Sequence, residues 1–381
     1  MKVGTTKILL TGGGSGGHIY PLLAVVEALK KAASQRKEYL EIFYLGPDDN
    51  YSGLLKNAGI KTKSIPAGKI RRYLSPLTIL DIPKIFFGIF VALWKVYWIM
   101  PDAIFSKGGT GALPVVIAGW FYRIPIIIHE SDAAPGLNNL LSAWFASRIA
   151  VSFEAALKYF NPKKSAWVGT PIRVELIKNR PSRETAKENF GFDAQEPLIL
   201  ILGGSLGSDR INKFVVSNLA GLIKETQVMH QTGQANYSEI EKLSRAALID
   251  LAVDTATKTR YKAVPYFKDD LKIALSAADI VVSRAGSGTI FEIAAFEKPA
   301  ILIPLHGSAN DHQRKNAYEF ARGGGAIVIE EENLLPAIFI AQIRSILKNE
   351  EAMNKMALAS SKFFKPQATE TIAQELLNLS D

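Results

Sequence analysis

Short hydrophobic runs alternate with longer segments of mixed polarity along both halves of the chain. In the first half the runs occupy residues 7–11, 41–45, 103–106, 125–129 and 148–151. In the second half they occupy residues 197–202, 227–230, 261–264, 279–283, 299–303 and 326–329. Such runs are typical of strands buried on both faces, and helices fit between them. The pattern predicts an α/β protein with parallel sheets covered by helices.

The two halves begin alike, which predicts two domains. Each opens with a strand that runs into a glycine-rich turn, at residues 12–17 and again at residues 203–207. A strand, a glycine turn and a helix open a Rossmann-like unit, and 381 residues exceed the usual size of one core. We expect two doubly wound Rossmann-like domains, residues 1–168 and 169–365. A last helix, at about residues 366–381 after the break at Pro366, is expected to pack back on the first domain.

A strongly apolar helix is predicted over residues 81–100, with Pro83 in its first turn. Apolar residues recur at spacings of three and four, and aromatic residues widen the stripe. These residues are Ile82, Phe86, Ile89, Leu93 and Val96, widened by Phe90, Trp94 and Trp98. The apolar stretch is shorter than the roughly 20 residues that a membrane-spanning helix needs. The helix is therefore expected to lie on an apolar surface, either a membrane leaflet or the core of its own domain.

Charge and composition narrow the choice of partner. The formal net charge is +9, and residues 54–100 alone contain eight basic residues and one acid. An anionic partner is expected, with Lys69, Arg71, Arg72 and Lys84 as candidates to meet lipid phosphates. Nucleic acid is not expected, because the basic residues are interleaved with aliphatic and aromatic runs. The absence of cysteine excludes disulfides, thiolate nucleophiles and cysteine-ligated metals.

The first glycine turn, residues 12–17, offers backbone N–H groups to a phosphate at a helix N-terminus. It is not a Walker loop, and Asp48 is only a loose match to the acidic residue of the dinucleotide fingerprint. A tight turn without a ligand is the alternative. His18 follows the turn and is a candidate general base for a substrate hydroxyl, with a loop-capping histidine as its alternative.

A second polar cluster, His129-Glu130-Ser131-Asp132, follows another buried strand and suits a polar substrate. The alternative is that Ser131 or Asp132 caps the next helix. A metal held by His129 and Glu130 is not expected, because neighbouring residues of a strand point to opposite faces.

The second half repeats the strand, turn and helix pattern at residues 284–292. Helix amides near Ser287 can hold a pyrophosphate, and Glu292 can accept hydrogen bonds from a ribose diol or act as a capping residue. Arg173, near the predicted domain boundary, can hold a phosphate or make a surface ion pair. A further polar loop, residues 306–313, follows the strand at 300–303.

Taken together, five motifs resemble the MurG family of N-acetylglucosaminyltransferases, glycosyltransferase family 28, in order and over nearly the whole chain. They are residues 13–18, 129–132, 135–138, 203–207 and 283–292. The family's usual His-Glu-Gln-Asn appears here as His-Glu-Ser-Asp. The resemblance implies a GT-B fold, in which two Rossmann-like domains face a central cleft. It also implies inverting transfer of GlcNAc from UDP-GlcNAc to the MurNAc 4-hydroxyl of lipid I, giving lipid II for peptidoglycan synthesis.

The resemblance also implies substrate-binding residues. Those carried over by position are Ser15, Gly16, Gly17, Asp132, Arg173, Ser205, Ser287, Gly288, Thr289, Glu292 and Gln313. Phe267 resembles the family's residue beside the uracil, with a plain core aromatic as its alternative. The expected catalytic residues are His18 as base, with Glu130 as second choice or orienting partner. Helix amides near Ser287, assisted by Arg173, are expected to stabilise the UDP leaving group without a metal or other cofactor.

The expected partners are UDP-GlcNAc, lipid I, anionic lipids of the cytoplasmic face of the plasma membrane, and other cell-wall synthesis proteins. A peripheral location there is expected, because the first residues resemble no export signal. The rivals are another GT-B glycolipid or natural-product glycosyltransferase, or a non-catalytic nucleotide-sugar-binding protein. The presence of His18 argues against the last.

Overall fold

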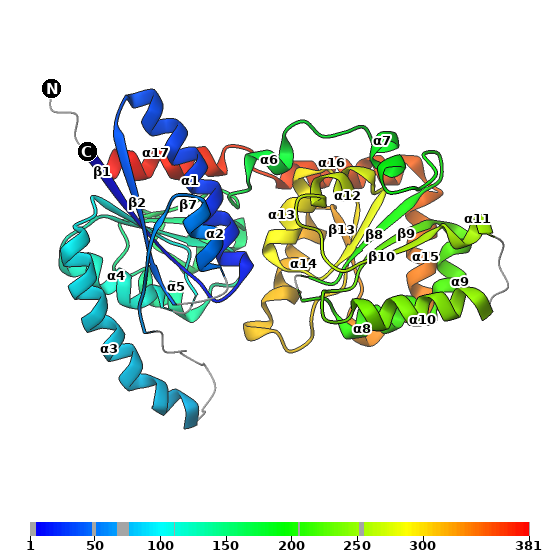
Figure 1. The fold of residues 1–381 in the computed structure, drawn as a ribbon, viewed down its shortest axis with the longest axis horizontal. Helices are drawn as coiled ribbons and strands as arrows, with labels where there is room; N and C mark the ends of the chain where they lie inside the picture. The colour runs from blue at the N-terminus through cyan, green and yellow to red at the C-terminus, as the bar shows by residue number, and fades with distance from the viewer. Residues whose placement is uncertain are drawn as a thin grey trace. The chain divides into compact units, whose positions relative to one another are not determined.

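The computed structural model describes residues 5–47, 51–66, 76–109, 111–204, 206–250 and 255–380. Asp48, Lys69, Arg71, Arg72 and Ser205, all named in the sequence analysis, lie outside these residues. The chain divides into two compact units. Unit 1 comprises Met1–Arg173 and Lys365–Asp381, and unit 2 comprises Val174–Phe364. Each unit is a parallel sheet covered by helices (Figure 1), which confirms the predicted fold class.

The strands of unit 1 form one parallel sheet in the order β3-β2-β1-β4-β5-β6-β7. Their bounds are β1 (Thr5–Thr11), β2 (Tyr39–Gly46), β3 (Lys61–Ser64), β4 (Ala103–Ser106), β5 (Ile126–Glu130), β6 (Arg148–Val151) and β7 (Ser165–Trp167). The helices are α1 (Gly16–Arg36), α2 (Ser52–Asn57), α3 (Pro76–Ile99), α4 (Ala112–Phe121), α5 (Leu137–Ser142), η1 (Glu154–Tyr159) and α17 (Ala368–Ser380). The edge strands β3 and β7 were not predicted.

The strands of unit 2 form a second parallel sheet in the order β10-β9-β8-β11-β12-β13. Their bounds are β8 (Leu198–Leu202), β9 (Gln227–Gln231), β10 (Tyr261–Val264), β11 (Ile280–Ser283), β12 (Ala300–Leu302) and β13 (Ala326–Val328). The helices before β11 are α6 (Val174–Ile177), α7 (Arg183–Asn189), α8 (Asp209–Ser217), α9 (Leu219–Glu225), α10 (Tyr237–Asp250), α11 (Thr255–Lys258) and α12 (Leu271–Ala277). Those after it are α13 (Ser287–Ala295), η2 (Ala309–Asp311), α14 (His312–Arg322), η3 (Glu331–Asn333), α15 (Pro336–Leu347) and α16 (Glu350–Phe363).

Alternate residues of β1 build the two cores of unit 1. Ile8 and Leu10 are buried with α1 on one face of the sheet, and Leu9 is buried with α3 and α4 on the other. The first core is completed from the far end of the chain, because α17 packs against α1 and contributes Ile372 and Leu376. Each fully buried leucine or isoleucine contributes roughly 1.5–3 kcal/mol to folding.

The apolar helix differs from its prediction. It begins at Pro76, five residues earlier than expected, so Pro83 lies inside the helix and the prediction of a first-turn proline is wrong. The buried face of the helix is narrower than the apolar stripe in the sequence, and it consists of Gly88, Ala92, Val96 and Ile99. A Cβ added at Gly88 would lie 2.7 Å from the carbonyl oxygen of Pro66, so only small residues allow this close approach.

The large aromatic side chains of α3 face away from that core. Phe86, Phe90, Trp94 and Trp98 are each more than 60% exposed. Among the described residues, we find no helix with the length and apolar character needed to cross a membrane.

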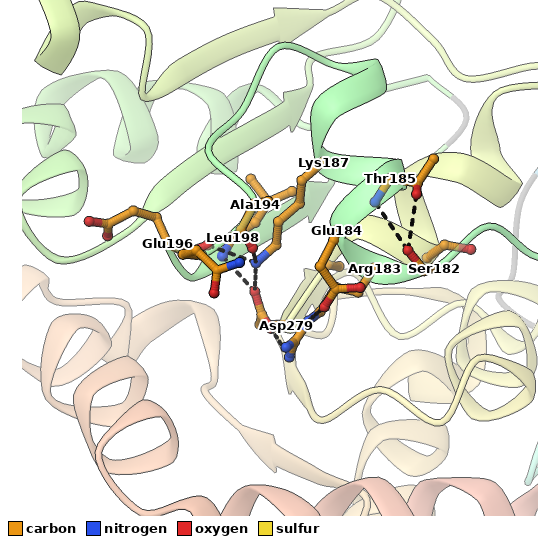
Figure 2. A network of polar contacts seen from close by, with 12 residues as sticks. Ser182, Arg183, Glu184, Thr185, Lys187, Ala194, Glu196, Leu198 and Asp279 are labelled. Atoms are coloured by element: carbon orange, nitrogen blue, oxygen red, sulfur yellow. Dashed lines mark hydrogen bonds and ion pairs between the residues drawn. The ribbon is translucent and has the colours of Figure 1, made fainter.

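A network of polar contacts joins α7 to the amino ends of β8 and β11 in unit 2 (Figure 2). The carboxylate of Asp279 accepts from the backbone N–H of Leu198 at 2.8 Å and pairs with Lys187 Nζ at 2.8 Å and with Arg183 Nη1 at 2.9 Å. The Lys187 side chain is buried, and its Nζ also donates to the carbonyl oxygen of Glu196. The network anchors α7 at the amino ends of these strands, whereas the predicted site residues follow their carboxyl ends.

Candidate active site

Three neighbouring strands bring the predicted residues of unit 1 to one sheet edge. β1 pairs with β4, and β4 pairs with β5, all in parallel. Their carboxyl ends lead to His18, to Lys107 and to the loop 130–139, respectively. The strand order reverses between β1 and β4, and such reversal points are where doubly wound sheets bind ligands.

The glycine turn presents His18 at the start of α1. Gly13 has φ +146°, and a Cβ there would lie 2.8 Å from the ring of Pro47, so the turn requires glycine. The hydroxyl of Ser15, the residue that precedes α1, does not cap the helix but contacts His18 Nδ1 at 3.0 Å. The imidazole also lies close to the backbone of Gly109, where a Cβ would approach it to 3.2 Å. The ring is thus fixed through Nδ1, which leaves Nε2 to receive a substrate proton.

The charge state of His18 suits a base. Burial, and then the positive charge of Lys107, lower the pKa of His18 to about 4, although Asp132 opposes the shift. The imidazole is therefore uncharged at neutral pH and has a lone pair that can accept a proton, although a pKa of about 4 makes it a weaker base than an ordinary histidine.

Glu130 makes contacts of a different kind. One carboxylate oxygen accepts from the backbone N–H of Asp132 at 2.9 Å. The other accepts from the N–H of Gly136 at 3.2 Å and from Asn139 Nδ2 at 2.9 Å. Burial, and then Asp132, raise the pKa of Glu130 to about 7. Since both oxygens already shape the loop, the geometry favours Glu130 as an orienting residue.

His129 points away from this group, as expected for neighbouring strand residues. It is fully buried, and its Nε2 lies 2.9 Å from the carbonyl oxygen of Gly169. In the part of the chain that the structure describes, there is no group of three His, Cys, Asp or Glu side chains placed to hold a metal ion.

The last predicted residue of unit 1, Arg173, stacks on an aromatic ring. Its guanidinium lies 5.0 Å from the centroid of the Tyr20 ring. Tyr20 belongs to α1, so this cation–π contact places Arg173 near the helix that carries His18.

Unit 2 repeats the design on β8, β11 and β12, which are also neighbours. α13 begins at Ser287, directly after Gly286, whose backbone is extended and which has no side chain to cap the helix. A Cβ added at Gly286 or Gly288 would meet no atom within 4 Å. The two glycines therefore border open space at the start of α13, and the first amides of a helix can bind an anion at such a place. Glu292 lies on the second turn of the same helix.

Three side chains hold the loops of this edge. Gln231 donates to the carbonyl oxygen of Gly204 and accepts from the backbone N–H of Phe267, both at 3.0 Å. Gln313 accepts from the N–H of Leu305 at 3.0 Å. Asn316 donates to the carbonyl oxygen of Ala285 at 3.3 Å. Gln313 was predicted as a contact to the UDP-sugar, and in this structure its side-chain oxygen is bonded to the loop.

Phe267 is buried, and its ring packs edge-on against Phe190 with the centroids 6.1 Å apart. This packing favours the alternative of a core aromatic over a side chain that stacks on a base.

Sequence reasoning missed two buried cations. Arg284 donates to Ser208 Oγ at 2.7 Å and pairs with Glu331 at 2.5 Å, so it ties the residue that precedes α8 to η3. Lys107 donates to Ser131 Oγ. Both residues directly follow buried strands, at the same place in the pattern as the predicted residues, and that position was the available signal.

The comparisons with known proteins agree with this geometry. Residues 8–151 match the glycosyltransferase family 28 N-terminal domain, and residues 198–372 match the family's C-terminal domain. A Bacillus cereus protein, "UDP-N-acetylglucosamine--N-acetylmuramyl-(pentapeptide) pyrophosphoryl-undecaprenol N-acetylglucosamine transferase 2", is 36% identical over 97% of this chain and 99% of its own length. A Clostridium botulinum transferase of the same name, without the numeral, is 38% identical over 92% of this chain and 93% of its own.

Solved structures give the same result. The crystal structure of Acinetobacter baumannii MurG has a TM-score of 0.74 and 26% identity, covering 98% of this chain and 99% of that one. The Neisseria meningitidis UDP-GlcNAc 2-epimerase, solved with UDP-GlcNAc bound, has a TM-score of 0.67 at 14% identity, covers 98% of this chain and 100% of that one, and shows the fold alone. The GT-B fold class is confirmed, and the chain belongs to the MurG family of N-acetylglucosaminyltransferases in glycosyltransferase family 28.

Proposed function

We propose that this protein transfers GlcNAc from UDP-GlcNAc to the MurNAc 4-hydroxyl of lipid I, with inversion, and so forms lipid II. The observation that carries the proposal is a pair of half-sites at equivalent sheet edges: a fixed, uncharged histidine in unit 1 and an uncapped helix N-terminus in unit 2. The names of the relatives supply the substrates, since they are called N-acetylglucosamine transferases acting on N-acetylmuramyl-(pentapeptide) pyrophosphoryl-undecaprenol.

The donor half-site stabilises the leaving group. When the anomeric C–O bond breaks, negative charge develops on UDP, and the first amides of α13 with the positive end of the helix dipole can stabilise it. On the same helix, Glu292 offers an acceptor for the ribose diol. The acceptor half-site supplies the base: His18 removes the proton of the 4-hydroxyl at Nε2, while Glu130 holds the loop that carries Asp132.

A peripheral location on the cytoplasmic side of the plasma membrane belongs to the same proposal. The exposed aromatic face of α3 provides one apolar surface in unit 1. A hollow of about 420 Å³, lined by Trp120, Leu141, Trp144 and Phe145 of the α4–α5 region, provides a second. Exposed aromatic side chains at this density are typical of proteins that insert into a lipid interface.

Transfer of labelled GlcNAc to a short-chain lipid I analogue tests the proposal. Wild-type protein is expected to form the lipid II analogue, and His18→Ala is expected to lose roughly 10²–10⁴-fold in kcat while still binding UDP. A wild-type protein that binds UDP-GlcNAc yet transfers only to other glycolipids would favour the rival glycosyltransferase. Binding without transfer to any acceptor would favour a nucleotide-sugar-binding protein.

A further inference from the structure

Lys107 is a fully buried lysine beside the acceptor half-site that takes no part in the proposed transfer step. Its side chain is 1% exposed, although lysine is rarely buried without a partner. Its backbone N–H donates to the carbonyl oxygen of Thr11 at 2.9 Å, and its Nζ donates to Ser131 Oγ. The backbone of Lys107 therefore joins the ends of β1 and β4, and its side chain runs on to the loop after β5.

The charged groups around Lys107 come from both neighbouring strand ends. The carboxylates of Glu130 and Asp132 stabilise its positive charge, so its pKa falls on burial only to about 8. In the opposite direction, its charge acts on the imidazoles of His18 and His129 and lowers the pKa of each, second in both cases to burial. It also opposes the rise in the pKa of Glu130.

We propose that Lys107 is a positioning residue of the acceptor half-site, which holds the loop 130–139 through Ser131 and places a buried positive charge near His18. The inference rests on the proposed function, in which His18 takes the acceptor's proton. A neutral side chain at position 107 would leave Glu130 and Asp132 without their buried cation. It would also remove the repulsion that disfavours a charged imidazole, so His18 would hold a proton at higher pH than in the wild type.

An NMR titration of the histidine ring protons in the full chain tests this charge effect without any substrate. His18→Ala assigns the His18 signal among the five histidines. The titration midpoint of His18 is expected to rise by about one pH unit in Lys107→Met, which keeps a straight side chain, and to stay near the wild-type value in Lys107→Arg. An unchanged midpoint in Lys107→Met would overturn the proposal.

Ser131→Ala provides a second variant that keeps the ammonium and removes its hydrogen bond, in case Lys107→Met does not fold. We expect an unchanged His18 midpoint together with a several-fold lower kcat/KM for the lipid I analogue, because the loop loses its anchor. An unchanged kcat/KM would refute the positioning role of the Lys107–Ser131 contact.

The pH profile of transfer supplies the kinetic readout. In Lys107→Met, the acid limb of kcat/KM for the acceptor is expected to move upward by about one pH unit, with KM for UDP-GlcNAc unchanged, and Lys107→Arg should restore the limb. If kcat/KM for the acceptor fell by the same factor at every pH, Lys107 would have only a packing role and the proposal would be wrong. If wild-type protein transfers no GlcNAc, the proposed function fails, while the NMR titration still decides the role of Lys107.

Discussion

At the scale of single residues, the structure distinguishes the two candidates for the base, His18 and Glu130. His18 is held through one ring nitrogen, Nδ1, and is uncharged at neutral pH, whereas both oxygens of Glu130 accept hydrogen bonds from their own loop. One residue is arranged to accept a proton, and the other is arranged to hold a loop.

This difference predicts unlike effects for two conservative substitutions. Glu130→Gln places an NH₂ group against the donors of Asp132 or of Gly136 and Asn139. We therefore expect the free energy of unfolding to fall by about 1–3 kcal/mol and kcat to fall as well. His18→Gln should lower kcat with little change in stability. Thermal unfolding and turnover of both variants provide the check. A stable Glu130→Gln variant without turnover would instead identify Glu130 as the base.

At the scale of elements, the strands were predictable and the faces of α3 were not. Eleven strands were predicted from their apolar runs. The two that were missed, β3 and β7, are short strands at the edges of the unit 1 sheet: β3 (Lys-Thr-Lys-Ser) has no apolar residue, and β7 (Ser-Ala-Trp) has only three residues. The apolar stripe of α3 left open whether it faces the core or a membrane; in the structure its aromatic residues are exposed, and the face that packs is the one with Gly88 and Ala92. A sequence pattern reports which residues are apolar, but it does not report how closely two backbones approach.

The close approach at Gly88 makes α3 sensitive to a single methyl group. Gly88→Ala places a Cβ 2.7 Å from the carbonyl oxygen of Pro66, so we expect a loss of about 1–3 kcal/mol in the stability of unit 1. Gly53→Ala, in helix α2, is the matched control, because its Cβ would meet nothing within 4 Å and alanine favours a helix. Denaturant unfolding distinguishes the two. Equal stability of both variants would show that α3 does not depend on this contact.

The buried ion pairs around Asp279 are expected to contribute more to stability than an exposed ion pair does. Asp279→Asn leaves the Lys187 ammonium buried with weaker compensation, and we expect a loss of about 3 kcal/mol in the stability of unit 2. Glu241→Gln breaks the exposed pair with Arg245 instead and should cost less than about 1 kcal/mol. Chemical denaturation followed by a probe in unit 2 makes the comparison. Similar losses for both variants would contradict a role for burial.

At the scale of the whole molecule, each unit places its candidate residues on the switch point of one parallel sheet. The motifs and their order were accessible from the sequence, because strand, turn and helix signals recur with the polar residues at strand ends. The family followed from the resemblance of these motifs to known ones. Lys107 and Arg284 escaped notice, since the burial of a cation depends on strands that are distant in sequence but adjacent in the sheet.

The exposed aromatic surface predicts membrane association. A double variant that combines Trp94→Ser and Trp98→Ser should bind vesicles that contain anionic lipid at least about tenfold more weakly, because each indole contributes apolar area to the interface. Leu358→Ser, at an exposed leucine of unit 2, is the control. Co-sedimentation with vesicles measures the effect. Undiminished binding of the double variant would place the contact elsewhere.

The most direct test of the proposed function is the identity of the product formed by wild-type protein from UDP-GlcNAc and a lipid I analogue. We predict one GlcNAc added to the MurNAc 4-hydroxyl with inverted configuration, one UDP released for each product, and no transfer to an acceptor whose 4-hydroxyl is blocked. Release of UDP without a disaccharide product, or equal transfer to the blocked acceptor, would contradict the proposed function.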